Sequence, residues 1–112
     1  MENKDMNNRP NERPFFSIVM PVYNGQKYIK TMIESIRRQS VTDWELLVVD
    51  DCSTDQSRKI VAELAEKDGR IRLIAVERNA GVSHARNLGI REAKGNYLWL
   101  ADADDLVEEN LL

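Results

Sequence analysis

Four short apolar runs, each followed by a stretch of helical length or a polar segment, constrain the fold of this chain more than any other feature. They comprise residues 16–22, 44–49, 71–76 and 97–101. Strands that alternate with helices predict a parallel sheet joined by right-handed crossovers. Such a sheet is covered on both faces, so its strands read as continuous apolar runs. We therefore predict an α/β fold with three layers, α/β/α, around a mainly parallel sheet.

The segments between these runs carry helix signals. Helices are expected over about residues 25–39, 53–69 and 81–95. Asn24 should cap the first helix, and Ser53 with Gln56 resembles a capping box for the second. Each helix has an apolar face at helical spacing. The residues expected to face inward are Tyr28, Ile29, Met32, Ile33, Ile36, Ile60, Val61, Leu64, Val82, Ala85, Leu88, Gly89 and Ala93.

Composition adds limits on the class of protein. The 112 residues suffice for one core. Residues 1–14 are polar and aperiodic, which predicts a disordered tail before a domain over 15–112. The net charge of −3, without a basic stripe, argues against a nucleic-acid partner. A single cysteine, Cys52, excludes a disulfide within the chain.

The chain carries no signal for export or membrane insertion. No apolar run approaches the roughly 20 residues of a membrane span, and residues 1–14 lack the apolar region of a secretory signal. A cytoplasmic location is expected, and peripheral attachment to the inner face of the membrane through other regions is left open.

Polar side chains gather where the predicted strands end. Ligands of open parallel sheets bind beyond the carboxyl ends of the strands, so residues from four separate segments should meet along one edge. These residues are Pro21, Val22, Tyr23 and Asn24 after the first run, Asp50 and Asp51 after the second, Arg78 and Asn79 after the third, and Asp102, Ala103, Asp104 and Asp105 after the fourth.

The acidic pair Asp102 and Asp104 is the most specific of these signals. Residues i and i+2 of an extended segment point the same way, and two nearby carboxylates repel each other unless a cation lies between them. A divalent cation with oxygen ligands, such as Mn²⁺ or Mg²⁺, would relieve that repulsion. The alternative is that Asp104 or Asp105 caps a following helix.

Three further candidate binding positions could each have a purely structural role instead. A carboxylate at Asp50 or Asp51 could accept a hydrogen bond from the imide N–H of uracil, or both residues could belong to a turn. Arg86 could reach a diphosphate with its planar guanidinium, or point to solvent. The Tyr23 ring could stack on a base or pack against the protein.

Together these segments resemble the family 2 glycosyltransferases, whose nucleotide-binding unit has the GT-A fold. Residues 17–24 (SIVMPVYN) are similar to the opening strand and turn of that family, and residues 47–55 (LVVDDCSTD) to its uracil-binding segment. Residues 78–87 (RNAGVSHARN) and 102–105 (DADD) are similar to the segment after the third strand and to the DXD metal motif. The chain departs from the pattern at Cys52, where the family commonly has glycine.

The resemblance implies roles for particular residues. Asp104 would be the main metal ligand, Asp102 would contact ribose or metal, and Arg86 would approach the phosphates. The other residues expected to bind the nucleotide-sugar are Pro21, Val22, Tyr23, Asn24, Asp50, Asp51, Asn79 and Ala103.

The resemblance also implies the reaction and the partners. The enzyme would be an inverting, metal-dependent glycosyltransferase. It would move a sugar from a nucleotide-sugar, expected to be a UDP-sugar, to a hydroxyl of a saccharide or glycolipid acceptor in polysaccharide or glycoconjugate synthesis. Its catalytic base would lie beyond Leu112, so the chain is expected to be a portion of a longer enzyme, with exposed apolar surface that favours homo-oligomers.

Two rival classes share parts of this pattern. A sugar nucleotidyltransferase would need a glycine-rich, basic loop after the first strand, where this chain has a single glycine, Gly25. A Mg²⁺-binding receiver module would need a lysine after a late strand, which the chain does not contain. Both rivals fit less well than a glycosyltransferase.

Overall fold

A computed structural model describes residues 15–101 of the chain as alternating strands and helices. The elements are β1 (Phe16–Val22), α1 (Ile29–Arg37), β2 (Trp44–Asp50), α2 (Ser57–Lys67), β3 (Ile71–Ala75), α3 (Val82–Glu92) and β4 (Tyr97–Leu100). The order predicted from the apolar runs is therefore confirmed. No helix among the described residues is both long enough and apolar enough to cross a bilayer.

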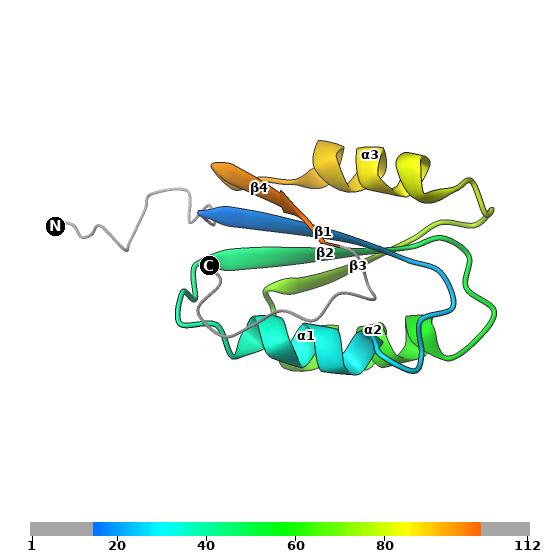
Figure 1. Cartoon of the computed structure of the whole chain (residues 1–112), viewed down its shortest axis with the longest axis horizontal. Coiled ribbons are helices and arrows are strands. Elements are labelled where there is room, and N and C mark those ends of the chain that lie inside the picture. The colour runs from blue at the N-terminus through cyan, green and yellow to red at the C-terminus, as the bar shows by residue number, and fades with distance from the viewer. Residues whose placement is uncertain (1–14, 102–112) are drawn as a thin grey trace, which may run out of the picture.

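The strands form one parallel sheet in the order β3-β2-β1-β4. Helices α1 and α2 cover one face of this sheet and α3 covers the other, which gives the three predicted layers (Figure 1). The chain moves outward from β1 to β3 and then returns through α3 to place β4 on the other side of β1. The strand order thus reverses beside β1, and such a point is where open α/β sheets bind ligands.

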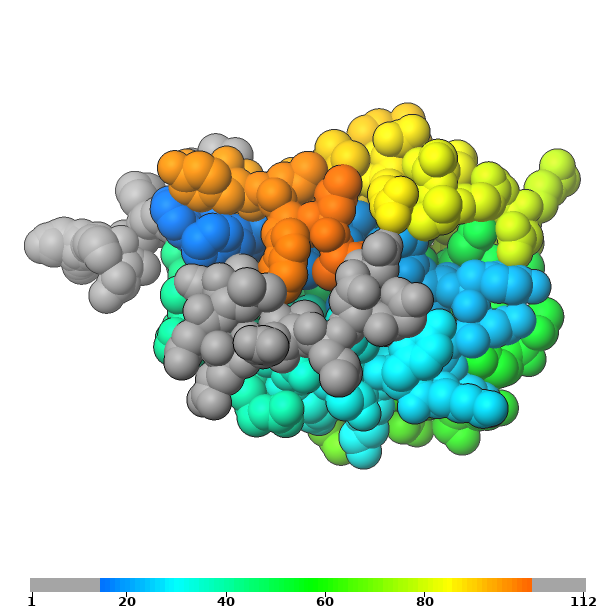
Figure 2. Space-filling view, viewed as in Figure 1, coloured from blue at the N-terminus to red at the C-terminus, as the bar shows by residue number. Residues whose placement is uncertain are grey.

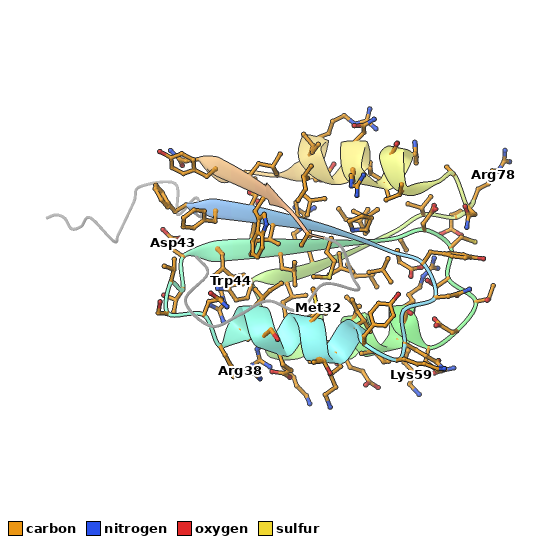
Figure 3. The ribbon with its side chains drawn as sticks, in the orientation of Figure 1. Met32, Arg38, Asp43, Trp44, Lys59 and Arg78 are labelled. Atoms are coloured by element: carbon orange, nitrogen blue, oxygen red, sulfur yellow. The ribbon has the colours of Figure 1, made fainter. Side chains whose placement is uncertain are left out.

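The two faces of the sheet have separate apolar cores. Against α1 and α2, the strand residues Ile18, Met20, Leu46 and Val48 pack on a helix face that includes Met32. Figure 3 shows Met32 and Trp44 between these helices and the sheet. Against α3 the core is smaller and contains Val19, Leu47, Val49 and Ala85. Because side chains of each strand alternate between these two cores, the middle parts of the inner strands β1 and β2 are apolar on both faces, and their polar residues Ser17, Glu45 and Asp50 lie near the strand ends.

The helix starts differ from the predicted capping. Helix α1 begins after Tyr28 and α2 after Gln56, and neither start has a side-chain cap hydrogen bond. The predictions for Asn24 and for Ser53 with Gln56 were therefore wrong. The side chains of Asn24 and Ser53 each accept hydrogen bonds from the other's loop, and Gln56 donates its backbone N–H to the side chain of Gln26. The residues between each strand and its helix form loops at the carboxyl edge of the sheet.

Strand β4 is the most exposed strand of the described region. Tyr97, Leu98 and Leu100 are each about half exposed, while Trp99 packs against the larger core. Figure 2 shows the β4 residues in orange on the visible surface. Exposed apolar surface on this strand agrees with the expectation from the sequence. On α3, Val82 is half exposed although it was predicted to face inward.

A buried carboxylate fixes β4 at the amino edge of the sheet. Glu45 Oε2 accepts hydrogen bonds from Ser17 Oγ at 2.6 Å and from the backbone N–H of Lys94 at 2.6 Å. The Ser17 hydroxyl in turn accepts the N–H of Gly95 at 2.7 Å. These bonds join β1, β2 and the loop before β4, so the start of β4 is held in register with β1.

An acidic residue at the end of α2, Asp68, makes the stability of the fold decrease at acidic pH. Asp68 accepts hydrogen bonds from Arg70 Nη2 at 2.8 Å and Arg37 Nε at 3.2 Å, and the Arg70 guanidinium lies 3.9 Å from the ring centroid of Trp44. The side-chain hydrogen bonds from Arg70, which outweigh the opposing effect of burial, lower the pKa of Asp68 from 3.8 to about 2. A carboxyl with a depressed pKa stabilises the fold above its unfolded pKa and loses that contribution as the pH falls through the folded value.

We therefore expect Asp68→Asn to lower the free energy of unfolding by about 1–2 kcal/mol at neutral pH. The difference between the parent and the variant should shrink as the pH falls from about 4 to about 2, because the parent is protonated over that window. Urea denaturation at a series of pH values measures both quantities. A difference that stays constant down to pH 2 would contradict the ion-pair explanation.

Candidate functional site

Three loops that follow β1, β2 and β3 meet at the carboxyl edge of the sheet, and Asp51 joins two of them. Its Oδ1 accepts the backbone N–H of Ala80 at 3.0 Å and its Oδ2 accepts that of Gly81 at 2.9 Å. The Asp51 N–H donates to the carbonyl of Val22 at 2.8 Å, which connects it to the end of β1. Asp51 is 4% exposed, yet each carboxylate oxygen retains a lone pair for a further donor.

A small cavity of about 80 Å³ lies beside Asp51, between the strand ends and the start of α3. The residues that line it are Pro21, Val22, Tyr23, Asp51, Val82 and Ala85. Four of these were predicted from the sequence as nucleotide contacts. Val82 and Ala85 were predicted only as inward-facing helix residues, although their position just after Gly81 could have indicated a place beside the strand ends.

Tyr23 forms an open wall of this cavity. Its side chain is 51% exposed, whereas Pro21 and Val22 before it are buried. The exposed ring lies at the end of β1, on the side of the sheet where the strand order reverses. A planar ligand could therefore lie against Tyr23 while it reaches the carboxylate of Asp51.

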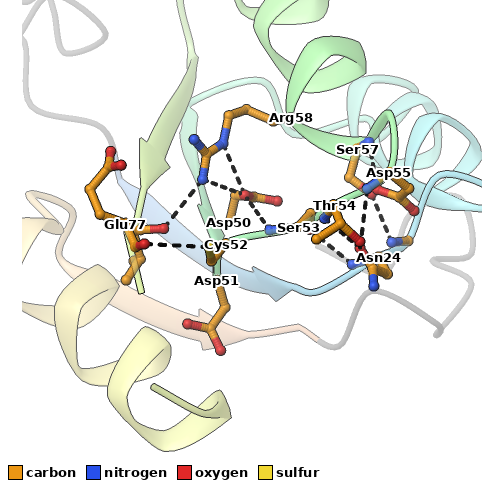
Figure 4. Close-up of polar contacts among 12 residues, drawn as sticks. Asn24, Asp50, Asp51, Cys52, Ser53, Thr54, Asp55, Ser57, Arg58 and Glu77 are labelled. Carbon is orange, nitrogen blue, oxygen red and sulfur yellow. Dashed lines mark hydrogen bonds and ion pairs between the residues drawn. The ribbon is translucent and has the colours of Figure 1, made fainter. Parts of the chain in front are cut away.

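Asp50 points away from Asp51 and into the protein (Figure 4). Its Oδ2 accepts hydrogen bonds from Arg58 Nε at 3.0 Å and from the backbone N–H of Ser53 at 3.1 Å, and Arg58 also donates to the carbonyl of Val76 at 3.3 Å. Its Oδ1 is buried without a hydrogen-bond partner. Asp50 is thus engaged in holding the β2 loop to α2 and β3, and the sequence did not indicate Arg58 as its partner.

Cys52 adopts a backbone conformation that explains why glycine is common at such a position. Its φ is 64°, in the left-handed region that costs residues with a Cβ roughly 1–2 kcal/mol. The thiol donates to the carbonyl of Glu77 at 3.4 Å, which connects the β2 loop to the end of β3. Cys52 is the free thiol of a loop, as its position in the sequence suggested.

Three other predicted residues, Asn24, Asn79 and Arg86, are described by the structure but do not line the cavity. Asn24 bonds to the β2 loop, with Oδ1 accepting the N–H of Thr54 at 2.8 Å. Asn79 lies in the β3–α3 loop beside Ala80, and Arg86 is half-buried on α3, next to Ala85. Asp102, Ala103 and Asp104 lie outside the described residues.

Hydrogen bonds also perturb one acid of the β2 loop. Although burial by itself raises the pKa of Asp55, the bonds donated by Ser57 and Gln26 outweigh it, and the pKa lies below its ordinary value. Asp55 is therefore ionised near neutral pH and accepts hydrogen bonds from the β1 loop and from the first residue of α2.

The described part of the chain does not itself contain a metal centre. Among residues 15–101, no group of three or more histidine, cysteine, aspartate or glutamate side chains could hold an ion. The described chain ends at the buried Ala101, whose N–H donates to the carbonyl of Val19 at 2.9 Å. Strand β4 therefore ends at the carboxyl edge of the sheet, the edge at which Tyr23 and Asp51 also lie.

The strand order, the position of the cavity and the convergent polar loops define a class of open α/β domains that bind ligands at the carboxyl edge of a parallel sheet. Within that class, the family model described as glycosyl transferase family 2 matches residues 17–112. The chain belongs to this family, as the four sequence segments had indicated.

Relatives identified as glycosyltransferases agree with this family assignment. Over 96 residues the chain is 40% identical to glycosyltransferase GlyG of Streptococcus pneumoniae, covering 86% of this chain and 32% of the relative. Over 95 residues it is 39% identical to the putative teichuronic acid biosynthesis glycosyltransferase TuaG of Bacillus subtilis, covering 85% and 38%. The chain thus spans about a third of the length of these curated relatives.

Solved structures confirm the fold. The structure of S. aureus TarS 1–349 in complex with UDP is 32% identical and superposes with a TM-score of 0.79, covering 86% of this chain and 29% of that one. The mannosyltransferase PcManGT from Pyrobaculum calidifontis, in complex with GDP-Man and Mn²⁺, is 31% identical with a TM-score of 0.77, covering 84% and 28%. The sheet is therefore that of a GT-A glycosyltransferase.

Proposed function

We propose that residues 15–112 form the donor-binding part of a glycosyltransferase that transfers a sugar from a UDP-sugar to an acceptor hydroxyl. The observation that carries this proposal is the position of Asp51, a buried carboxylate with free lone pairs at the edge of a cavity lined by Tyr23 and apolar side chains. Support comes from family membership and from TarS, which was solved with UDP.

The geometry around Asp51 favours a base with a ring N–H donor, such as uracil, over cytosine. A carboxylate is an acceptor only, and the two loop N–H groups leave it able to accept one more hydrogen bond. Uracil presents an imide N–H, whereas cytosine has a bare nitrogen at the same ring position. In this proposal the Tyr23 ring supplies a surface for the base. Asp50, whose Oδ2 accepts hydrogen bonds from Arg58 and Ser53, would hold the β2 loop instead.

The diphosphate would lie toward the end of β4. We propose Asp102 and Asp104 as ligands of Mn²⁺ or Mg²⁺ there, with Arg86 near the phosphates, because β4 leaves the sheet beside β1 at the edge where the cavity opens. Paired carboxylates suit such a hard cation. A bound ion would neutralise charge on the diphosphate leaving group. PcManGT, solved with Mn²⁺, supports a metal in this family.

The reaction proposed is a direct displacement at the anomeric carbon with inversion. The acceptor hydroxyl of a saccharide or glycolipid attacks, a carboxylate base removes its proton, and UDP leaves. The residues of this chain contribute by holding the base, ribose and diphosphate of the donor in place. Parts of the enzyme beyond Leu112 would bind the acceptor and supply the carboxylate that removes its proton.

The first loop argues against a nucleotidyltransferase. Such an enzyme needs backbone N–H groups after the first strand to hold a triphosphate. Here the N–H groups of Asn24, Gly25 and Gln26 donate to Ser53, Ser57 and Asp55. This loop therefore presents none of those three donors to a phosphate.

A thermal-shift experiment tests the proposed function. The 112-residue chain is heated with UDP, GDP, dTDP or CDP, and with UDP-sugars, each with and without Mn²⁺. We expect stabilisation by UDP ligands that increases with Mn²⁺, because a ligand bound only by the folded state raises the melting temperature. Equal shifts for all four nucleotides would remove the uracil assignment, and no shift with any of them would overturn the donor site.

The metal ligands can be tested separately. Asp104→Asn is expected to weaken UDP binding in Mn²⁺ roughly tenfold or more, because it removes one of two carboxylates from the cation. Without a divalent metal, the parent and the variant should bind UDP equally. Isothermal calorimetry measures both, with Asp105→Asn as the matched control. Equal affinity of Asp104→Asn and the parent in Mn²⁺ would exclude Asp104 as a ligand.

A further inference from the structure

The loops after β1 and β2 exchange hydrogen bonds in a reciprocal pattern that connects both walls of the cavity. Three successive backbone N–H groups of the β1 loop, at Asn24, Gly25 and Gln26, donate to side chains of the β2 loop and of the first residue of α2, at 2.9, 2.7 and 3.1 Å. Three successive N–H groups of the β2 loop, at residues 54–56, donate to side chains of the β1 loop at 2.8, 3.3 and 2.9 Å. We name this set of bonds, between residues 24–26 and 53–57, the loop interlock.

Asn24 is the centre of the loop interlock (Figure 4). Its Oδ1 accepts the N–H groups of Thr54 and Asp55, and its own N–H donates to Ser53 Oγ. Its φ of 53° lies in the left-handed region, which asparagine tolerates better than most residues. The residue type and the backbone conformation are therefore both required for these bonds.

The loop interlock lies directly beside the two residues that would contact the base. Tyr23 immediately precedes Asn24, and Asp51 is two residues before Ser53. The N–H of Asp51 also donates to the carbonyl of Val22. Movement of one loop against the other would change the separation of the Tyr23 ring and the Asp51 carboxylate, whereas a base must meet both at once.

We propose that Asn24 is a positioning residue of the donor site, which fixes the spacing between Tyr23 and Asp51 through the loop interlock without touching the nucleotide. This inference rests on the proposed function and replaces the expectation that Asn24 contacts the nucleotide-sugar directly. The side-chain oxygen of Asn24 accepts hydrogen bonds from the β2 loop, and its neighbour Tyr23 would contact the nucleotide instead.

Three substitutions at Asn24 separate the acceptor oxygen from the backbone conformation. Asn24→Asp keeps an acceptor and tolerates the left-handed region, Asn24→Gly keeps only the conformation, and Asn24→Ala keeps neither. The control is Asn96→Ala, an exposed asparagine before β4 at the opposite edge of the sheet. The readouts are UDP and CDP affinity by calorimetry at a temperature where every variant is folded, and amide hydrogen exchange without ligand.

We expect Asn24→Ala and Asn24→Gly to weaken UDP binding roughly tenfold and to reduce the preference for UDP over CDP, as the loss of one positioning acceptor implies. Asn24→Asp and Asn96→Ala should bind UDP within about twofold of the parent. Without ligand, exchange should accelerate at Thr54 and Asp55 in the Ala and Gly variants.

The outcomes are distinguishable. If the parent binds no UDP, the proposed function fails and this role of Asn24 fails with it. If the parent binds UDP and Asn24→Ala binds it equally well, only the role of Asn24 fails. A lower melting temperature with unchanged affinity and base preference would make the loop interlock purely structural. A failure of Asn24→Asp to restore binding would contradict the role assigned to the acceptor oxygen of Asn24.

Discussion

Replacement of Asp51 by asparagine is expected to weaken UDP binding by roughly 10- to 100-fold, because hydrogen bonds to a charged acceptor contribute about 1.5–3 kcal/mol. The Asp51 carboxylate serves the N–H groups of Ala80 and Gly81 and, in our proposal, the imide of uracil. An asparagine has only one acceptor oxygen for these three donors. One donor must therefore lose its partner.

The same substitution should change the preference for the base. The amide N–H₂ of asparagine can donate to the ring nitrogen of cytosine, which the carboxylate cannot do. UDP affinity should therefore fall while CDP affinity rises, so the ratio of UDP to CDP affinity should fall by more than the change in CDP affinity alone. Calorimetry with both nucleotides measures this ratio.

The control for charge is Glu66→Gln, which removes a carboxylate from the exposed face of α2. It should leave UDP affinity within about twofold of the parent. A folded Asp51→Asn variant that retains the parent affinity and the parent base preference would contradict the assignment of Asp51.

Enlargement of Gly89 is expected to have the largest effect on stability. A Cβ at this position of α3 would overlap Val19 Cγ1 and lie 3.2 Å from Val49 Cγ2. Both valines are fully buried and branched at Cβ, so they cannot move aside easily. We expect Gly89→Val to lower the free energy of unfolding by about 3 kcal/mol. Gly89→Ala should lower it by about 1–2 kcal/mol, since the better helix propensity of alanine offsets part of the overlap.

Urea denaturation measures these changes, with Gly69→Ala as the control. A Cβ at Gly69 would have no neighbour within 4 Å, so its effect should stay within about 0.5 kcal/mol. The double variant Val19→Ala with Gly89→Ala should cost less than the sum of the two single changes, because the smaller residue makes room for the new methyl group. Additive effects would show that Gly89 is not limited by contact with Val19.

The position of α3 also affects the candidate site. The N–H of Gly81, the residue before α3, donates to Asp51, and Val82 and Ala85 line the cavity. A helix pushed away from Val19 should displace these groups. Gly89→Val is therefore expected to weaken UDP binding as well, although the residue lies outside the cavity lining.

The sequence predicted the order of the strands and helices well, but it predicted the hydrogen bonds of the loops poorly. Periodicity located the inner strands and the buried face of α1, where Ile29, Met32, Ile33 and Ile36 are fully buried. The capping predictions failed because asparagine and serine side chains can bond to any nearby backbone N–H. In this protein the nearest donors for Asn24 belong to a loop about 30 residues away in the chain. Local patterns carry no information about such partners.

The amino-acid sequence by itself determined the α/β class, the parallel sheet and the set of polar residues that follow its strands. It also carried the four segments by which the family was identified, since these depend on residue type and order alone. Only the tertiary structure separated Asp51 from Asp50. The two are adjacent acids in the chain, but successive side chains of an extended segment point in opposite directions, so one meets Arg58 and the other meets the cavity. The packing of α2 and α3 on opposite faces of the sheet decides which of the two side chains points toward Arg58 and which points toward the cavity.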